Sequence, residues 1–409
     1  MSFLIAAVIM IALVAVLTLF TGKGKGGSAK GNTNKNKAQI IKEANKRLAK
    51  NPHDPLGLVP LGEVYFDSQL WDKAFSVYSD LVKLALAKKD GTIDLFTSFL
   101  RQGITALKLE KLPEATQSLI NATKINSVAY EPNYYLGQTM VKLEQYDKAI
   151  DLAAKGIGKY PKYNSFNRIG LYAADKKKDY ATAVAYGEKL FSTPDTVKFT
   201  ANDYIFYGDA LTNVGRFDDA VAAYNKLPEV DPENKDVKKY IADTYTKAKR
   251  FTDAVAAMEA YIAAKGEGVT YKEYDALADI YIDEASVEGA ANDAKVKAFE
   301  NADKVYAQIE TKFDYAAAYA VWKRALMNYQ INPDVKVGRA LPFYKKYIDI
   351  VSAKAEKTAS ETSKLATAYT YLAVHYIQND KKEEAKEWAT KLLEIKPDDP
   401  NGLQIMSIK

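Results

Sequence analysis

Residues 201–232 read A-N-D-Y-I-F-Y-G-D-A-L-T-N-V-G-R-F-D-D-A-V-A-A-Y-N-K-L-P-E-V-D-P and contain two short helical patterns. The first pattern is an apolar stripe at three- and four-residue spacing, made by Tyr204, Tyr207, Gly208 and Leu211. A second stripe begins after Gly215 and ends at Pro232. The stretch therefore predicts a hairpin of two helices with one apolar face, which has to be buried against neighbouring hairpins.

The same pattern recurs along most of the chain, and one alanine of each second helix marks its register. These alanines are Ala74, Ala115, Ala149, Ala183, Ala220, Ala254, Ala298, Ala340 and Ala385. The shortest spacing between neighbours is 34 residues, so longer spacings indicate longer loops. The longest irregular stretches are expected at 283–292 and 332–337. After Gly402 the tail is too short for a full capping helix, and Leu403 and Met406 are expected to cover the last apolar face.

The copies resemble the tetratricopeptide repeat family, in which Leu-Gly, Tyr, Ala, an aromatic residue, Ala and Pro stand at fixed places. Two copies that carry the resemblance are Leu136-Gly137 with Ala149, Ala153 and Pro161, and Leu372-Ala373 with Tyr376, Ala385, Ala389 and Pro397. The likeness covers residues 52–400. It implies an all-α fold, an α-solenoid wound as a right-handed superhelix of about nine hairpins over residues 38–409. It also implies a protein-binding scaffold without catalysis.

Ser2–Thr21 is a run of 20 residues without a charge. As a helix it would span about 30 Å, the thickness of the hydrocarbon core of a bilayer. The alternative is a cleaved signal peptide, but no Lys or Arg precedes the run and no small-residue cleavage motif follows it. We therefore expect residues 1–21 to be one transmembrane anchor.

Residues 22–37 are rich in Gly, Ser, Asn and Lys, a composition that predicts a flexible basic linker. Between residues 22 and 50 there are nine Lys and Arg residues and one acid, whereas the whole chain carries a formal net charge of +5. Positive charge beside a membrane span favours the cytoplasmic side. We expect a single-pass protein of the inner (cytoplasmic) membrane with cytoplasmic repeats; a periplasmic location remains the alternative.

The composition excludes several kinds of chemistry. Cysteine is absent, which removes thiol catalysis and thiolate metal sites, and the two histidines, His53 and His375, lack the spacing of a metal site. The repeats carry slightly more acid than base, so they lack the basic stripe that nucleic acids require. We expect no catalytic residue, metal or cofactor.

The resemblance implies that the first helices of successive hairpins line a concave groove. Positions two, five, nine and twelve of each repeat then face a protein or peptide partner. The predicted groove residues are Tyr134, Gln138, Asn202, Ile205, Asp209, Lys239 and Asp243. Some family members hold the carboxylate of a chaperone tail with a Lys and Asn clamp. Here Lys239 is followed by Asp243 where that clamp has Asn, so this partner is not expected.

An anchor followed by repeats is similar to bacterial inner-membrane tetratricopeptide proteins that recruit envelope-assembly enzymes or a protease. The best-known of these ends in a four-cysteine metal knuckle, which this chain lacks. Two alternatives to a partner-binding adaptor therefore stay open. One is a structural protein that associates with itself as a homo-oligomer, and the other is a regulatory subunit of an envelope-assembly or proteolytic complex.

Overall fold

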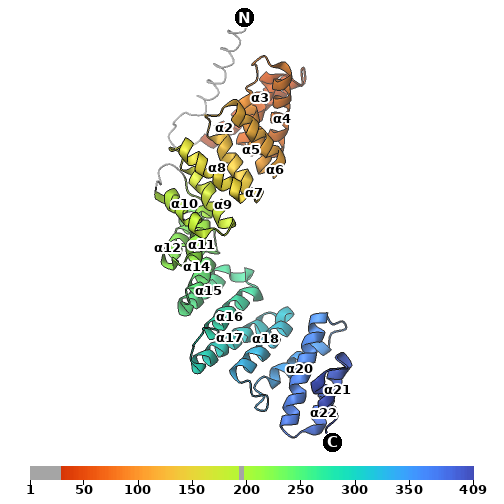
Figure 1. Ribbon diagram of the computed structural model, residues 1–409. Helices are drawn as coiled ribbons and strands as arrows, with labels where there is room; N and C mark the ends of the chain where they lie inside the picture. The colour runs from red at the N-terminus through yellow and green to blue at the C-terminus, as the bar shows by residue number, and fades with distance from the viewer. Residues whose placement is uncertain (1–28, 193–197) are drawn as a thin grey trace. The chain divides into compact units, whose positions relative to one another are not determined.

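The computed structural model describes residues 29–192 and 198–409, and every regular element in them is a helix (Figure 1). The all-α prediction is confirmed for these residues. Among the described helices, none combines the length and the apolar composition that a membrane span requires. The anchor predicted over residues 1–21 lies outside the described residues. The chain expected as one solenoid divides into two compact units, Met1–Val214 and Gly215–Lys409.

The first unit consists of a leading helix, four helix pairs and one further helix. The leading helix is α2 (Ala29–Leu48). The pairs are α3 (Pro55–Asp67) with α4 (Trp71–Lys88), α5 (Leu95–Lys108) with α6 (Leu112–Ile125), α7 (Glu131–Lys142) with α8 (Tyr146–Lys159), and α9 (Ser165–Lys176) with α10 (Tyr180–Ser192), followed by α11 (Ala201–Asn213). Helix α2 begins inside the segment predicted as a linker, and its Ala44 packs with Leu58 and Leu61 of α3. It therefore covers the apolar edge of the first pair.

The second unit begins with the short helices α12 (Phe217–Tyr224) and α13 (Leu227–Val230). Four pairs follow: α14 (Val237–Lys247) with α15 (Phe251–Lys265), α16 (Tyr271–Ala285) with α17 (Asn292–Lys312), α18 (Ala317–Ile331) with α19 (Leu341–Ser352), and α20 (Ala359–Gln378) with α21 (Lys382–Ile395). The loop after α18, residues 332–340, is long, as predicted. Helix α16 continues to Ala285, so the stretch predicted as irregular at 283–292 is confined to residues 286–291 and is not unusually long. Counted by sequence alone, α11 and α12 make a ninth helix–turn–helix pair in the described residues, with the unit boundary between them.

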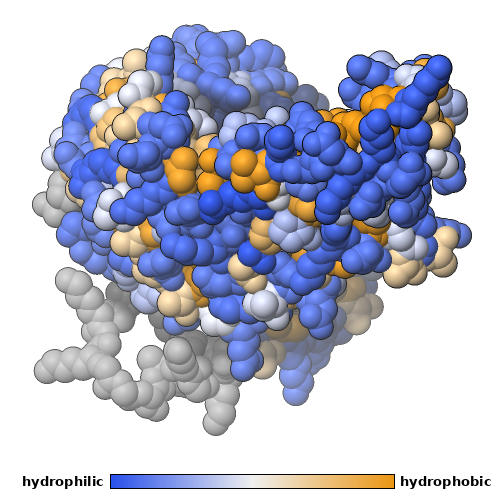
Figure 2. All heavy atoms as spheres, turned by 90° about the horizontal axis from the view of Figure 1, so that it is seen from below, coloured by the Kyte–Doolittle hydropathy of each residue, from blue (hydrophilic) through white to orange (hydrophobic). Residues whose placement is uncertain are grey.

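A last helix, α22 (Pro400–Met406), covers the end of the second unit. Ile405 is buried with Ala385 and Ala389 of α21, because Asp399 caps the helix and sets its rotation. The prediction that Leu403 and Met406 provide this cover is wrong, since they are 51% and 43% exposed. The face drawn in Figure 2 is mostly hydrophilic, with apolar atoms in short strips.

The alanines that mark the repeat are buried throughout, and none of the nine is more than 2% exposed. A methyl group is the largest side chain that fits where two helices approach this closely. Glycine marks the tightest places: a Cβ on Gly103 would lie 2.7 Å from Leu119, and one on Gly137 would lie 2.9 Å from Ile169. Helix packing therefore confirms the register that the sequence predicts.

Seven of the nine pairs share one turn, whose central residue has a positive φ. These residues are Gln69, Glu110, Glu144, Lys178, Gly215, Lys249 and Asp380. The next N–H donates to the carbonyl five residues back, for example Asp179 N to Ala174 O at 2.8 Å. This bond satisfies an otherwise free carbonyl at the end of the first helix. In this set, glycine, the residue best suited to positive φ, stands at position 215 alone.

Candidate functional site: the first-helix faces of the two units

On α7, the predicted groove residues are shared between surface and core. Tyr134 is half-buried, and its ring meets Phe166 edge-on at a centroid distance of 6.4 Å. Tyr134 also packs against the cluster of Met140 and Ala149. Gln138, one helical turn further on, is half-buried as well. The groove position of Tyr134 is therefore also a packing position.

On α11, the predicted residues form a face that the buried core does not use. Asn202 is exposed, and Ile205 and Asp209 are half-buried. The buried residues of this helix are others, namely Asp203, Gly208, Ala210, Leu211 and Thr212. Positions 202, 205 and 209 recur at three- and four-residue spacing, so they share one side of the helix. This side is partly covered by the protein itself, and Asn213 Nδ2 donates to Asp209 Oδ1 at 3.1 Å.

In the second unit, the two predicted residues contact each other. Lys239 Nζ lies 3.2 Å from Asp243 Oδ2 on α14, and the two side chains are 43% and 56% exposed. A pair four residues apart on a helix surface contributes only about 0.3–0.5 kcal/mol. A ligand could therefore displace it at little cost.

Asp209 lies against a second carboxyl group that the sequence did not single out. Asp175, near the C-terminal end of α9, is 7% exposed and hydrogen-bonded to Asp209. Its Oδ1 has no hydrogen-bond partner. Burial, and then the charge of Asp209, raises the pKa of Asp175 to about 7. Asp175 lies one residue after the twelfth position of its repeat, and position twelve is the last position that the groove prediction includes.

The cations near this pair of carboxyl groups are engaged elsewhere. Arg168 of α9 donates from Nε and Nη2 to the two carboxylate oxygens of Asp203, each at 2.7 Å. Lys176 Nζ lies 5.0 Å from the ring centroid of Phe206. Within the residues that the structure describes, no ion pair reaches Asp175 or Asp209. The Asp175–Asp209 pair therefore has no ion-pair partner there, and the charge of Lys176 offsets only part of the effect of burial and of Asp209 on the pKa of Asp175.

A second acceptor on α9 also lacks a donor. Asn167 lies two helical turns before Asp175, on the same side of the helix, and is 7% exposed. Its amide nitrogen donates to Asn164 Oδ1 at 2.5 Å, but its own Oδ1 has no partner. Buried polar groups are normally hydrogen-bonded, so two unsatisfied acceptors on one side of α9 indicate a site where hydrogen-bond donors would bind.

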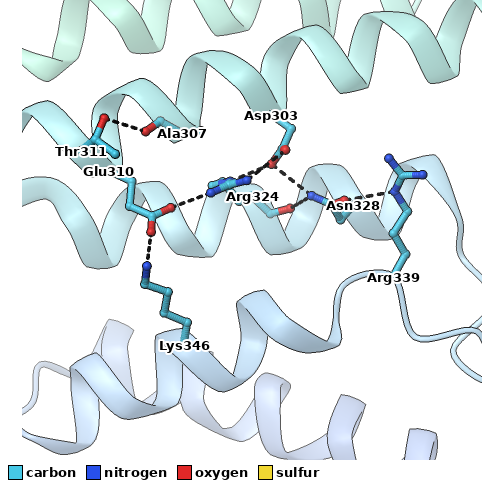
Figure 3. Close-up of polar contacts among 8 residues, drawn as sticks. All are labelled: Asp303, Ala307, Glu310, Thr311, Arg324, Asn328, Arg339 and Lys346. Atoms are coloured by element: carbon cyan, nitrogen blue, oxygen red, sulfur yellow. Dashed lines mark hydrogen bonds and ion pairs between the residues drawn. The ribbon is translucent and has the colours of Figure 1, made fainter.

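The second unit contains a polar network in which each buried carboxylate meets a cation (Figure 3). Arg324 of α18 bridges Asp303 at 3.0 Å and Glu310 at 2.8 Å, both on α17. Lys346 of α19 contacts Glu310 from the other side. Burial alone would raise the pKa of Glu310, but the hydrogen bonds from Lys346 and Arg324 lower this pKa below its usual value. The network ties three helices together and leaves no charge for a ligand.

A hollow of about 630 Å³ lies on the second helices of the first unit, between α6 and α8. Its floor includes Leu136 and Met140 of α7 and Leu152 of α8. Its edge carries Lys148, Lys155 and Lys159, none of which belongs to a predicted groove position. No pattern in the sequence predicts the hollow, because its existence depends on the distance between two second helices.

In the described part of the chain, no group of three or more His, Cys, Asp or Glu side chains is placed to hold a metal ion. The features outside the shared repeat packing are the Asp175–Asp209 pair on α9 and α11 and a hollow edged by lysines between α6 and α8.

Comparison with known proteins gives two family matches, both to the tetratricopeptide repeat, over residues 208–268 and 366–399. No curated protein matches the sequence. A tetratricopeptide protein fragment from Cytophaga hutchinsonii is 20% identical and covers 67% of this chain and 100% of its own, with a TM-score of 0.49. A tetratricopeptide protein from Parabacteroides merdae is 14% identical over 61% of this chain and 91% of its own, with a TM-score of 0.43.

YrrB, described as a tetratricopeptide protein with an unusual peptide-binding site, is 17% identical over 46% of this chain and 93% of its own, with a TM-score of 0.38. At these identities and scores, the likenesses carry no argument about a binding site. The family assignment rests instead on the two matched segments and on the buried alanines that run in register through the helix pairs. Residues 208–268 and 366–399 of this chain therefore match the tetratricopeptide repeat.

Proposed function

We propose that this protein is a scaffold that binds a segment of a partner protein along α9 and α11, and that the segment brings a cationic side chain to Asp209. The observation that carries the proposal is the α11 face of Asn202, Ile205 and Asp209, none of which is among the buried residues of this helix. A tetratricopeptide array uses its alanines and glycines for packing, so its remaining positions are free for recognition.

The charge on this face favours a cation over an anion or an apolar group. Asp209 shares its surroundings with Asp175, and the described residues supply neither of them with an ion-pair partner. A Lys or Arg side chain placed beside Asp209 would relieve the repulsion between the two carboxylates. Hydrogen bonds to charged groups are also worth more than those between neutral groups. A cationic partner segment would therefore supply the ion-pair partner that Asp209 lacks among the described residues of the free protein.

Affinity purification of the full chain from solubilised membranes, followed by mass spectrometry, tests this proposal. We expect Asp209→Lys and Asn202→Lys to lose partners that the unchanged protein captures, with no fall in melting temperature. The matched control is Asp147→Lys on α8, where the carboxylate is 82% exposed and paired with Lys177. Equal capture by the α11 variants and the control would mean that this face is not the binding surface. Lys239→Glu applies the same capture test to the predicted groove residues of the second unit.

We also propose that residues 1–21 tether the scaffold to the inner membrane with the repeats on the cytoplasmic side. The uncharged run Ser2–Thr21 and the basic residues that follow it support this orientation. Alkaline extraction of membranes should leave the full chain in the pellet, and protease added to intact spheroplasts should not cut the repeats. Release at high pH would overturn the tether, and cleavage in spheroplasts would place the repeats in the periplasm.

Self-assembly by end-to-end stacking has less support than partner binding. Stacking needs uncovered apolar ends, but α2 covers the first pair through Ala44 and α22 covers the last pair through Ile405. Terminal helices of this kind are how repeat arrays remain soluble. A regulatory subunit remains compatible with the scaffold, and the captured partner would distinguish the two roles.

A further inference from the structure

The hollow between α6 and α8 has the build of a second recognition surface. Its apolar floor is formed by Ile120 of α6, Leu136 and Met140 of α7, and Leu152 of α8. Met140 is 8% exposed, and the other three are half-buried. The hollow holds about 630 Å³, within the range of sites that accept a large side chain.

The position of α8 is fixed by its contact with α9 at Gly156. A Cβ on this residue would lie 2.2 Å from the ring of Phe166, so α8 meets α9 at a place where no other side chain fits. The ring of Phe166 is itself fully buried and stacks on Tyr160 at 5.6 Å. Closing the hollow by moving α8 would break these contacts. The hollow is therefore part of the packed structure of the unit.

The edge of the hollow is positively charged. Three lysines of α8, Lys148, Lys155 and Lys159, face a single acid, Asp151. Lys155 contacts Asp151 at 2.6 Å, but the two side chains are 75% and 61% exposed, which makes the pair weak. Lys148 donates to the amide oxygen of Gln145 at 3.0 Å, a neutral acceptor that a carboxylate could replace. Two positive charges thus remain uncompensated around an apolar floor.

We infer that this hollow is a docking site for an acidic segment of a partner protein, which inserts an apolar side chain between its carboxylates. The inference rests on the proposed scaffold function and adds a second surface with the opposite charge preference. Burial of one leucine-sized side chain supplies apolar contact, and the lysines select the flanking acids. A lipid surface fits less well, because the apolar floor is sunk between two helices while the charges lie along one of them.

Fluorescence anisotropy of the full chain in mild detergent tests the site with a labelled short peptide, a central leucine flanked by glutamates. We expect saturable binding that Lys148→Glu/Lys155→Glu weakens by about tenfold or more, in line with loss of close charge pairs. Lys148→Gln/Lys155→Gln should weaken it less. The matched control Lys88→Glu/Lys108→Glu changes the net charge equally on exposed positions of α4 and α5 and should bind as the unchanged protein does.

Three results would overturn the inference: no saturable binding of the glutamate peptide, equal binding of a peptide with lysines in place of the glutamates, or equal weakening by the control pair. Binding to anionic vesicles that depends on Lys148 and Lys155, without binding of the peptide, would assign the surface to lipid instead. Asp209→Lys should leave the peptide affinity unchanged. If the peptide does not bind at the hollow but the α11 face still captures its partner, the proposed scaffold function is retained and only the second site is rejected.

Discussion

Two clusters of carboxyl groups, one in each unit, differ in how their negative charge is compensated. In the second unit, Arg324 lies between Asp303 and Glu310, and Lys346 adds a second cation to Glu310 (Figure 3). In the first unit, Asp175 and Asp209 lie together, and the described residues form no ion pair with either of them. The Arg324 network joins α17, α18 and α19. The Asp175–Asp209 pair joins α9 and α11, the first helices of successive pairs.

The difference separates a structural role from a binding role. A buried carboxylate is costly unless it is paired and hydrogen-bonded, so the Arg324 network is what allows acids to be buried there at all. The Asp175–Asp209 pair has no ion-pair partner among the described residues, so the free-energy cost of burying its charge is not offset in this way. Such a pair is expected where the missing charge comes from a ligand or where the proton is shared. The contrast leads to predictions of different sign and size.

The largest effect is expected at Arg324. Replacing it by methionine keeps much of its length but leaves Asp303 and Glu310, which are 18% and 10% exposed, with one cation fewer. We expect a loss of about 3 kcal/mol of stability, measured by urea unfolding, because an unpaired buried charge remains. Arg250→Met is the control, since this arginine also contacts two acids but is 44% exposed. Equal losses in the two variants would show that burial does not set the value of the network.

The next effect has the opposite sign and depends on pH. The raised pKa of Asp175 means that the folded protein holds a proton that the unfolded chain releases above about pH 4, so stability should fall as pH rises towards about 7 and stay low above it. Asp175→Asn removes this cost and should stabilise the protein at pH 8 by about 2 kcal/mol, within the limit of about 1.4 kcal/mol per unit of pKa shift.

The same substitution at Asp203 provides the matched control. Asp203 is fully buried but accepts hydrogen bonds from Arg168 and from the hydroxyl of Tyr172 at 2.7 Å. Asp203→Asn should therefore destabilise the protein at pH 8, the opposite of Asp175→Asn. Thermal denaturation of both variants between pH 5 and pH 8 decides the matter. A loss of stability in Asp175→Asn at pH 8 would show that the pair is already compensated.

The smallest effect is expected in the turns that both units share. Lys178 holds a φ of 65° in the turn where Gly215 has 83°. A left-handed conformation costs a residue with a Cβ about 1 kcal/mol, so Lys178→Gly should stabilise by about that amount and Gly215→Ala should destabilise similarly. Nothing lies within 4 Å of a Cβ built on Gly215, so the second change tests backbone strain alone. Unchanged melting temperatures would show that the turns carry no strain.

The repeat register was predictable from sequence because it depends on local spacing. Alanines at the close approaches, such as Ala115 and Ala149, are buried as expected, and a long loop follows α18. Turns at Glu110 and Lys178 were not predictable from glycine, because the bond to the preceding helix holds these residues at positive φ.

The candidate surfaces were predictable in part. The spacing rule selects Asn202, Ile205 and Asp209, which do lie outside the core. The rule also selects Tyr134, whose ring is shared with Phe166, a contact between separate helices that spacing cannot reveal. Asp175 was missed for the same reason, because its role depends on how α9 lies against α11.

The central claim is that a partner lies on the α9 and α11 face and requires its negative charge. Photo-crosslinking in intact cells tests this most directly, with a benzophenone residue at Asn202 and, for comparison, at the exposed Ala181 of α10. We expect a defined partner to crosslink from position 202, Asp209→Lys to abolish this product, and position 181 not to give it. The same product from position 181, or a product from position 202 that survives Asp209→Lys, would show that no partner binds this face through its charge.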